Sequence, residues 1–328
     1  MILMKNITVA VLRGGPSDEY ETSMETGRNV LTALQNSLYK TRDIVITKQG
    51  QWLVDGFHKA PEQALFAVDV VFIALHGAYG EDGTVQRILD KLYIPYTGTS
   101  AYSSSIAINK DLAKGHIGEL SVLLPRHMRV TAEGVSDPMQ TADSISRLFG
   151  EQYIVKPTYG GSSFGVRKAK GAHELGIVIK ELLQVYHDLL IEEYIQGTEA
   201  TVGIIERYRE QELYDLPVIE IIPPDDEEFF SNKAKYDGST QEICPARFSR
   251  TTKELLAQHA KEIHSQLGLR HYSRSDFIVN DEGIYFLEVN TLPGLTDNSL
   301  FPKALEAVGS SHDDFVHHLI TQALSNDI

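Results

Sequence analysis

The 328-residue sequence is poor in cysteine, in clustered basic residues and in long apolar runs. Cys244 is the only cysteine, which excludes a disulfide framework or a structural zinc site within the chain. The formal net charge of −15, with no cluster of lysine and arginine, argues against a nucleic-acid-binding surface. The apolar stretch after Met1 is too short for a membrane span and carries no signal-peptide cleavage pattern. We therefore expect a cytoplasmic protein that binds neither nucleic acid nor membrane.

The composition, with 42% hydrophobic and 23% charged residues, is that of a globular protein, and the length suggests two or three domains. An apolar run over residues 7–12 ends in a glycine turn and precedes a helical pattern over residues 21–35, which is how an α/β unit begins. The turn has neither the G-x-G-x-x-G nor the Gly-Lys-Ser/Thr spacing of nucleotide loops. Its candidate residues are Glu21 and Ser23, near the strand end where α/β sheets bind ligands. The alternative is a helix-start carboxylate and a surface serine.

A second apolar run, residues 68–75, ends at His76 in a loop rich in glycine. Glycines beside a histidine suggest a backbone shaped for close approach to a ligand. The alternative is a buried structural imidazole. After Gly98 a serine-rich segment leads to Lys110, and we place the first domain boundary there.

Two lysines flank a glycine- and serine-rich turn over residues 159–165. Lys156 lies in the apolar run before it, and Lys110 lies upstream. Such a turn can lay backbone N–H groups over phosphates while lysines neutralise their charge, although a plain hairpin loop is also possible.

Glu192 and Glu199 flank a strand, turn and strand that could hold adenine and ribose, because carboxylates accept hydrogen bonds from ribose hydroxyls. Farther on, residues 222–246 form a long irregular acidic segment, and Lys235 and Tyr236 at its centre favour a lid over the substrates.

A β-hairpin is predicted where two apolar runs, residues 277–279 and 284–287, flank a turn-forming stretch. A three-residue loop with Gly283 in the left-handed conformation would pair Asn280 with Ile284. Counting back along both strands then gives the pairs Asp276 with Glu288 and Arg274 with Asn290, all on one face. A loop one residue longer or shorter would send one strand's side chains to the other face.

Two facing carboxylates, Asp276 and Glu288, would repel one another unless a cation lay between them. With the amide of Asn290 they form an oxygen-only set that suits Mg²⁺ or Mn²⁺. The alternative is that Asp276 pairs with Arg274 while Glu288 lies at the rim.

Seven motifs resemble, in the same order, those of D-alanine–D-alanine ligases of the ATP-grasp superfamily. They are LHGAYGEDGTVQ, IPYTG, KPTYGGSSFGV, EEYIQGTE, KAKY, RSDF and LEVNTLPGLTDNS. The resemblance spans nearly the whole chain and implies an α/β (α+β) fold of three subdomains with ATP between the central and C-terminal sheets. The implied subdomains are residues 1–98 (N-terminal, substrate-binding), 99–192 (central) and 193–328 (C-terminal, with lid and metal site).

The resemblance also implies an activity. An ATP-dependent ligase would join two D-alanines through an acyl phosphate, supplying D-alanyl-D-alanine for peptidoglycan precursors. The expected partners are ATP, D-alanine, two Mg²⁺ or Mn²⁺ ions and a second copy of the chain in a homodimer.

Each matching residue receives a role from the resemblance. Lys110, Lys156 and Lys235 would bind the phosphates and nucleotide, and Glu192, Tyr194, Ile195 and Glu199 the adenine and ribose. Asp276, Glu288 and Asn290 would bind metal. Glu21 would hold the first substrate's ammonium group in a hydrogen-bonded set with Ser162 and Tyr236, and His76 would lie near the first alanine. Arg274 and the Gly294 N–H would stabilise the oxyanion, and Ser299 would hold the second carboxylate.

The sequence departs from the family pattern at three places. Gly160 replaces a common acidic residue, Asn298 a frequent histidine, and residues 230–232 the usual Tyr-Asp-Tyr. An ATP-grasp ligase with D-serine or D-lactate as second substrate is therefore an alternative, although Lys235 and Tyr236 favour an amine nucleophile. A catalytically silent ATP-binding regulator is a third possibility, which the retained metal ligands and Arg274 oppose.

Overall fold

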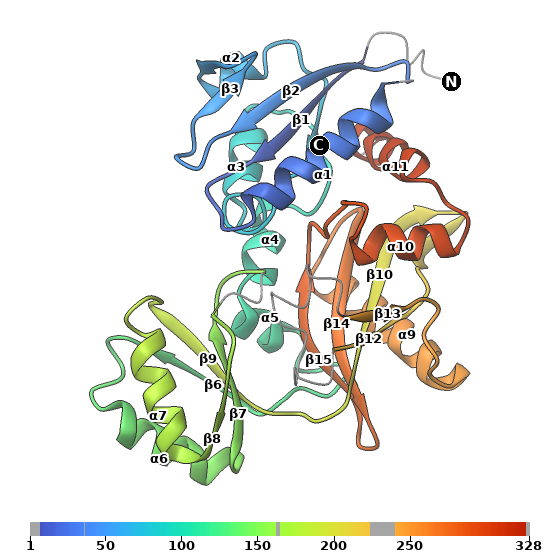
Figure 1. Cartoon of the computed structure of the whole chain (residues 1–328). Coiled ribbons are helices and arrows are strands. Elements are labelled where there is room, and N and C mark those ends of the chain that lie inside the picture. Colours follow the sequence, from blue (N-terminus) through green and yellow to red (C-terminus); the bar gives the residue numbers. More distant parts are fainter. Residues whose placement is uncertain (1–6, 36, 162–164, 224–239, 326–328) are drawn as a thin grey trace.

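The computed structural model describes residues 7–35, 37–161, 165–223 and 240–325, which form three β-sheets with helices around them (Figure 1). The N-terminal sheet has the strand order β4-β3-β2-β1-β5, and β1 pairs in parallel with β2 and β5. Its elements are β1 (Thr8–Gly14), α1 (Tyr20–Leu34), β2 (Lys40–Ile46), β3 (Trp52–Val54), β4 (Phe57–Lys59), α2 (Pro61–Ala64), β5 (Val70–Ile73) and α3 (Thr84–Lys91). The predicted α/β opening is confirmed, and β5 is buried along its whole length, as expected for a covered parallel strand.

The central sheet has the order β6-β9-β7-β8, with all three pairings antiparallel. Its elements are β6 (His127–Thr131), α6 (Pro138–Phe149), β7 (Gln152–Pro157), β8 (Arg167–Lys170), α7 (Gly171–Leu182) and β9 (Asp188–Glu193). The two helices pack on the sheet around a core of its own that includes Tyr153, Leu175 and Ile179.

The C-terminal sheet follows the path β13-β12-β10-β14-β15, with β11 beside β10. Its strands are β10 (Thr198–Tyr208), β11 (Gln211–Asp215), β12 (Ile219–Ile222), β13 (Gln241–Ile243), β14 (Tyr272–Asn280) and β15 (Gly283–Asn290). Helix α9 (Arg250–Gln266) lies between β13 and β14 in the sequence, and the helices α10 (Leu300–Ala307) and α11 (His312–Ser325) follow β15. Together the three sheets confirm the α/β (α+β) class. No helix of the described residues is long and apolar enough to cross a membrane.

Packing does not follow the predicted subdomain boundaries everywhere. Helices α4 (Ala101–Ala107) and α5 (Lys110–Ile117), assigned to the central subdomain, share a core with α9 and the C-terminal sheet. Helix α11, assigned to the C-terminal subdomain, packs on α1 and β5 of the N-terminal sheet, as its position beside α1 in Figure 1 shows. Helical faces can be predicted from periodicity, but the partner that covers them is a long-range choice.

Candidate active site

The hairpin of β14 and β15 has the two predicted pairs, Asp276 with Glu288 and Arg274 with Asn290. The pairing between the turn and these residues differs from the prediction. The loop is one residue shorter than predicted, because Asn280 pairs with Gly283. A β-bulge then inserts Leu287 as an extra residue on β15, between the pairs of Phe277 and Asp276. The bulge restores the register that the short loop would have shifted. The predicted pairs are thus confirmed, and the predicted loop is wrong.

Asp276 is held by four donors at its two carboxylate oxygens. Arg274 donates from Nε to Oδ1 at 2.9 Å and from Nη2 to Oδ2 at 2.8 Å. Thr201 Oγ1 donates to Oδ1 at 2.5 Å, and Asn290 Nδ2 to Oδ2 at 3.1 Å. Burial disfavours the charged guanidinium, but the Asp276 carboxylate outweighs burial and raises the pKa of Arg274. The alternative pairing of Asp276 with Arg274 is therefore present in this structure.

Glu288 faces a lysine from another element. Lys110 Nζ lies 3.2 Å from Glu288 Oε2, and the same ammonium donates to the carbonyl oxygen of Gly160. Lys110 is the first residue of α5, and Asn109 caps this helix by accepting from two backbone N–H groups. Gly160 has φ of +120°, a backbone conformation that residues with a Cβ rarely adopt. Glycine is therefore suited to this position in the chain.

Glu192 lies deeper than the ribose-binding role requires. Its side chain is 3% exposed and is shared by two lysines: Lys156 Nζ lies 2.8 Å from Oε2, and Lys114 Nζ lies 3.1 Å from Oε1. Burial alone would raise its pKa, but the two ammonium groups outweigh burial and lower the pKa of Glu192 to about 2. Glu192 is therefore a buried counter-ion that positions two lysines, and one of them, Lys114, is not predicted from the sequence.

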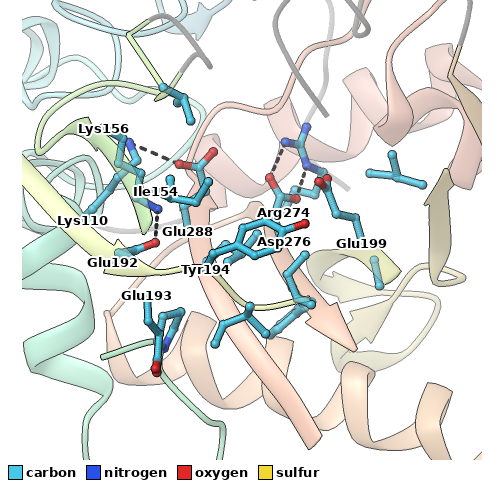
Figure 2. A pocket seen from close by; sticks show the side chains of 18 of the residues that line it. Lys110, Ile154, Lys156, Glu192, Glu193, Tyr194, Glu199, Arg274, Asp276 and Glu288 are labelled. Carbon is cyan, nitrogen blue, oxygen red and sulfur yellow. Dashed lines mark hydrogen bonds and ion pairs between the residues drawn. The ribbon is translucent and has the colours of Figure 1, made fainter. Parts of the chain in front are cut away.

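A cleft between the central and C-terminal sheets brings the predicted nucleotide residues together (Figure 2). It encloses about 1060 Å³, part of which is open to solvent. Its lining includes Lys110, Lys156, Glu192, Tyr194, Ile195, Glu199, Arg274, Asp276 and Glu288. Lys168 Nζ lies over the Tyr194 ring, 3.9 Å from its centroid. Leu287, the bulge residue, also lines this cleft, so the bulge contributes an apolar contact surface.

A second cavity adjoins the first and is also lined by Arg274. His76, Gly294 and Ser299, all predicted to bind substrate, line it, as does Asn298. The four residues come from two loops, the one after β5 and the one between β15 and α10.

His76 is buried and joins these two loops. One ring nitrogen lies 2.9 Å from Thr26 Oγ1 and the other 2.9 Å from the carbonyl oxygen of Leu292. Burial chiefly, with a smaller effect of the Arg274 charge, lowers the pKa of His76 to about 4, although the Leu292 carbonyl opposes the shift. The imidazole is therefore neutral at pH 7. It lines the second cavity and links the loop after β5 to the loop between β15 and α10.

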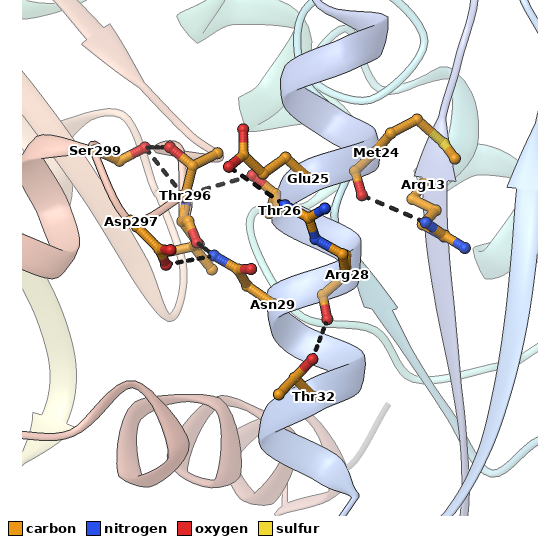
Figure 3. Close-up of polar contacts among 11 residues, drawn as sticks. Arg13, Met24, Glu25, Thr26, Arg28, Asn29, Thr32, Thr296, Asp297 and Ser299 are labelled. Atoms are coloured by element: carbon orange, nitrogen blue, oxygen red, sulfur yellow. Dashed lines mark hydrogen bonds and ion pairs between the residues drawn. The ribbon is translucent and has the colours of Figure 1, made fainter.

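Helix α1 fixes the loop that carries Ser299 (Figure 3). Asn29 Nδ2 donates to the Leu295 carbonyl oxygen at 3.1 Å and to Asp297 Oδ1 at 3.0 Å. Ser299 Oγ accepts from the Thr296 N–H at 3.1 Å, and a Cβ at position 294 would lie 2.7 Å from Ser299 Oγ. Only glycine therefore fits beside Ser299 without displacing it.

Glu21 does not lie in the second cavity. Its side chain is 82% exposed and lies 3.5 Å from Lys48 Nζ, as the alternative interpretation of a helix-start carboxylate held. Glu19, immediately before α1, lines the cavity instead. Two residues apart at a helix start are about 200° apart around the axis, so the two carboxylates point in different directions.

Ser23 differs from both of its interpretations. It is fully buried, accepts from the Gly14 N–H at 2.8 Å and donates to the Ala74 carbonyl oxygen at 2.7 Å. It therefore joins the ends of β1 and β5.

Glu81 is a residue that the sequence analysis missed. It is buried, and its carboxylate accepts four hydrogen bonds of 2.9 to 3.1 Å. The donors are the backbone N–H groups of Gly77, Thr291 and Leu292 and the Thr291 hydroxyl. Burial raises its pKa, although these donors oppose the shift. Its acid-rich loop, GEDG, was the only signal in the sequence.

Three predicted site residues, Ser162, Lys235 and Tyr236, lie outside the described residues, as do the departures at residues 230–232. Among the described residues, no group of three His, Cys, Asp or Glu side chains is placed to hold a metal ion. A metal at the hairpin would thus rest on two carboxylates and the Asn290 amide.

Three sheets, with a cleft between the last two that is lined by lysines and carboxylates, are the arrangement expected of an ATP-grasp ligase. Comparison with known proteins identifies the family. Models of the D-Ala–D-Ala ligase C-terminus and N-terminus match residues 121–321 and 55–99, respectively. A D-alanine–D-alanine ligase of Syntrophobacter fumaroxidans is 37% identical, covering 98% of this chain and 99% of the relative. This chain belongs to the D-alanine–D-alanine ligase family.

Solved structures agree with this assignment. A D-alanine–D-alanine ligase from Bacillus anthracis, complexed with ATP, is 28% identical with a TM-score of 0.79 and 97% of both chains covered. The VanG D-Ala:D-Ser ligase from Enterococcus faecalis is 27% identical with a TM-score of 0.83, covering 97% of this chain and 99% of that one. Both likenesses confirm the predicted ATP-grasp fold.

Proposed function

We propose that this chain joins two D-alanines at the expense of ATP, forming D-alanyl-D-alanine for peptidoglycan precursors. The observation that carries the proposal is that Arg274 lines both cavities, the cleft of the lysines and the cavity of His76 and Ser299. A phosphoryl group from one cavity and a carboxylate from the other would meet at this guanidinium.

The reaction divides into two steps. A carboxylate oxygen of the first D-alanine attacks the γ-phosphorus of ATP, the bond to the β-phosphate oxygen breaks, and ADP leaves. The amine of the second D-alanine then attacks the acyl carbon, loses a proton and displaces phosphate. Negative charge grows in both steps, so a fixed cation such as Arg274 lowers the barrier, by an amount typically about 3 kcal/mol for one such contact.

Lys110 and Lys156 are proposed to bind the phosphates, because both ammonium groups line the cleft on side chains that are less than one-tenth exposed. Tyr194, Ile195 and Glu199 are proposed to hold adenine and ribose. Glu192 keeps its place in the nucleotide site, as the counter-ion of Lys156.

Metal would bind at Asp276, Glu288 and Asn290. The donor set fits Mg²⁺, since two carboxylates are paired across the hairpin with an amide on the same face. Both carboxylates are paired with cations of the chain, and Asn290 presents its amide nitrogen to Asp276, so metal entry requires that Arg274 and the amide turn. The ion, when bound, would neutralise charge on the transferring phosphoryl group. The number of ions, two, stays a prediction.

The first substrate's ammonium group is assigned to Glu19 in place of Glu21, because Glu19 is the carboxylate that lines the second cavity. Arg274 and the Gly294 N–H are proposed to stabilise the oxyanion. Ser299, at the N-terminal end of α10, is proposed to hold the second substrate's carboxylate, since a helix N-terminus attracts anions.

One assay tests the proposal and separates it from its alternatives. Phosphate release with ATP and Mg²⁺ is measured with D-alanine alone and with D-alanine plus D-serine or D-lactate. The masses of the products are determined by mass spectrometry. D-alanyl-D-alanine as the main product is the expected result. A mixed dipeptide or depsipeptide would show a different second substrate, and binding of ATP without turnover would show a silent regulator. The homodimer and the cytoplasmic location stay predictions, and sedimentation checks the first.

A further inference from the structure

Lys114 is a fully buried lysine beside the nucleotide cleft, with a side chain that is 0% exposed. It does not line the cleft, so direct contact with a nucleotide cannot explain it. A charged ammonium group inside a protein is costly unless it is paired and hydrogen-bonded. The position therefore needs an account that the binding roles above do not give.

The contacts of Lys114 join two sheets. Its Nζ lies 3.1 Å from Glu192 Oε1 on β9 of the central sheet and donates to the carbonyl oxygen of Phe286 on β15 of the C-terminal sheet at 3.1 Å. The ammonium also lies 5.4 Å from the centroid of the Phe286 ring. Lys114 itself belongs to α5, which packs with the C-terminal sheet.

The chain of contacts continues into the cleft through Glu192. The second oxygen of this carboxylate lies 2.8 Å from Lys156 Nζ, so the order is Phe286 carbonyl, Lys114, Glu192, Lys156. Two ammonium groups thus share one carboxylate. If Lys114 were absent, Glu192 would neutralise Lys156 alone, and less positive charge would face the phosphates.

Helix α5 presents a second lysine one turn away. Lys110 and Lys114 are four residues apart and so lie on one face of the helix. Lys110 reaches Glu288 on β15, while Lys114 reaches Glu192 on β9. One helix therefore contacts two of the carboxylates at the cleft, Glu288 and Glu192.

We propose that Lys114 is a positioning residue of the nucleotide site: it takes one oxygen of Glu192, leaves the other to aim Lys156 into the cleft, and holds β9 to β15. The inference rests on the proposed binding of ATP in this cleft. Lys114 should therefore affect the binding of ATP and not the binding of D-alanine, because its contacts lead to the first cavity and not to the second.

The test compares Lys114→Met and Lys114→Arg with the wild type. Affinity for Mg–ADP is measured by calorimetry without D-alanine, and KM is measured for ATP and for D-alanine. We expect Lys114→Met to weaken Mg–ADP binding and raise KM for ATP by about ten-fold or more, with less than a two-fold change for D-alanine. Lys114→Arg, which keeps the charge, should restore most of the affinity.

Two controls separate positioning from general stability. Lys261→Met removes a lysine that pairs with Asp215 away from both cavities, and should change neither KM. In a double-mutant cycle, Lys114→Met should have little further effect on KM for ATP once Glu192→Gln is present, because its path to Lys156 runs through Glu192. If Lys114→Met does not fold, Lys114→Gln replaces it, since its amide still donates to the Phe286 carbonyl.

Three results would overturn the inference. They are an unchanged KM for ATP in a folded Lys114 variant, equal weakening of ATP and D-alanine, and full additivity with Glu192→Gln. Each of these leaves the proposed ligase function standing. Failure of the wild type to bind Mg–ADP would overturn both.

Discussion

The N-terminal and C-terminal sheets share an apolar core, whereas the central sheet has a core of its own and makes polar contacts with α5. Tyr272, Phe301 and Phe315 form an aromatic cluster, with centroids 5.1 to 5.6 Å apart, in a core that continues into β1 and β5. The central core is separate from it. Contacts of the central sheet with α5 include the ion pair of Lys114 with Glu192 and the bond from the Lys110 N–H to the Thr158 carbonyl oxygen at 3.0 Å.

This contrast indicates which wall of the cleft can move. Separating two parts of a shared apolar core exposes apolar surface, at about 25 cal/mol per Å². Polar contacts can exchange with water at a small net cost when they become solvated. We therefore expect the central sheet to be the wall that is displaced when nucleotide enters. Two glutamates contact α5, Glu288 on the fixed wall and Glu192 on the movable wall, and substitutions of them test this expectation.

The largest effect is expected on the fixed wall. Glu288→Gln should lower kcat by roughly 1000-fold or more, because it removes charge from the proposed metal site without changing volume. The change also removes the carboxylate partner of Lys110, whose side chain is 6% exposed, so some loss of stability is expected as well. Turnover and thermal unfolding are measured together. Retained turnover at ordinary Mg²⁺ would contradict the metal site.

Asp276→Asn is a poorer test of the same site. Asp276 neutralises the Arg274 guanidinium, whose side chain is 14% exposed, so this change should cost stability as well as activity.

On the movable wall, loss of the Glu192 charge should lower the stability of the fold. Glu192→Gln leaves the buried Lys114 and Lys156 without a counter-ion, and should lower the free energy of unfolding by about 3 kcal/mol. Glu193→Gln is the matched control, because its partner Arg126 is 59% exposed and solvent-exposed ion pairs contribute little to stability. Urea unfolding measures both. Equal losses in the two variants would show that burial of the pair is not decisive.

The link between the N-terminal and C-terminal parts should depend on pH. His76 has an ordinary pKa of 6.5 when unfolded and about 4 when folded, so the unfolded chain binds the proton first. Stability from this group is complete above pH 6.5 and is lost as pH falls toward 4. Between pH 7 and pH 5 the wild type should lose about 2 kcal/mol more than His76→Gln, by urea unfolding. Parallel losses would exclude His76 as the cause.

The smallest effect distinguishes the two acidic residues at the start of α1. Glu19→Gln should raise KM for D-alanine about ten-fold with little change for ATP, since a charged contact to an ammonium group is weakened. Glu21→Gln, on the exposed side of the helix, should behave as wild type. Steady-state kinetics with each substrate varied decides the matter. An effect of Glu21→Gln alone would restore the assignment made from the sequence.

The sequence predicts this site best where a residue's role depends on local pattern. The structure brings together the predicted pairs of the hairpin and two of the predicted lysines, Lys110 and Lys156, because strand alternation and motif order are local properties. Glu21 is predicted and Glu19 is not considered, and the sequence does not show at which residue α1 begins. The depth of Glu192 could not be predicted either, since it depends on Lys114, 78 positions away.

The hairpin that carries Asp276 and Glu288 makes a surface loop intolerant of length changes. Loop tips usually accept insertions and deletions, because nothing downstream depends on their length. Here a residue lost at the turn would turn Glu288 and Asn290 away from Asp276, while removing the bulge residue Leu287 would do the same from the other side. Descendants of this chain can therefore vary the turn only in compensated pairs, one residue gained at the tip for one lost at the bulge.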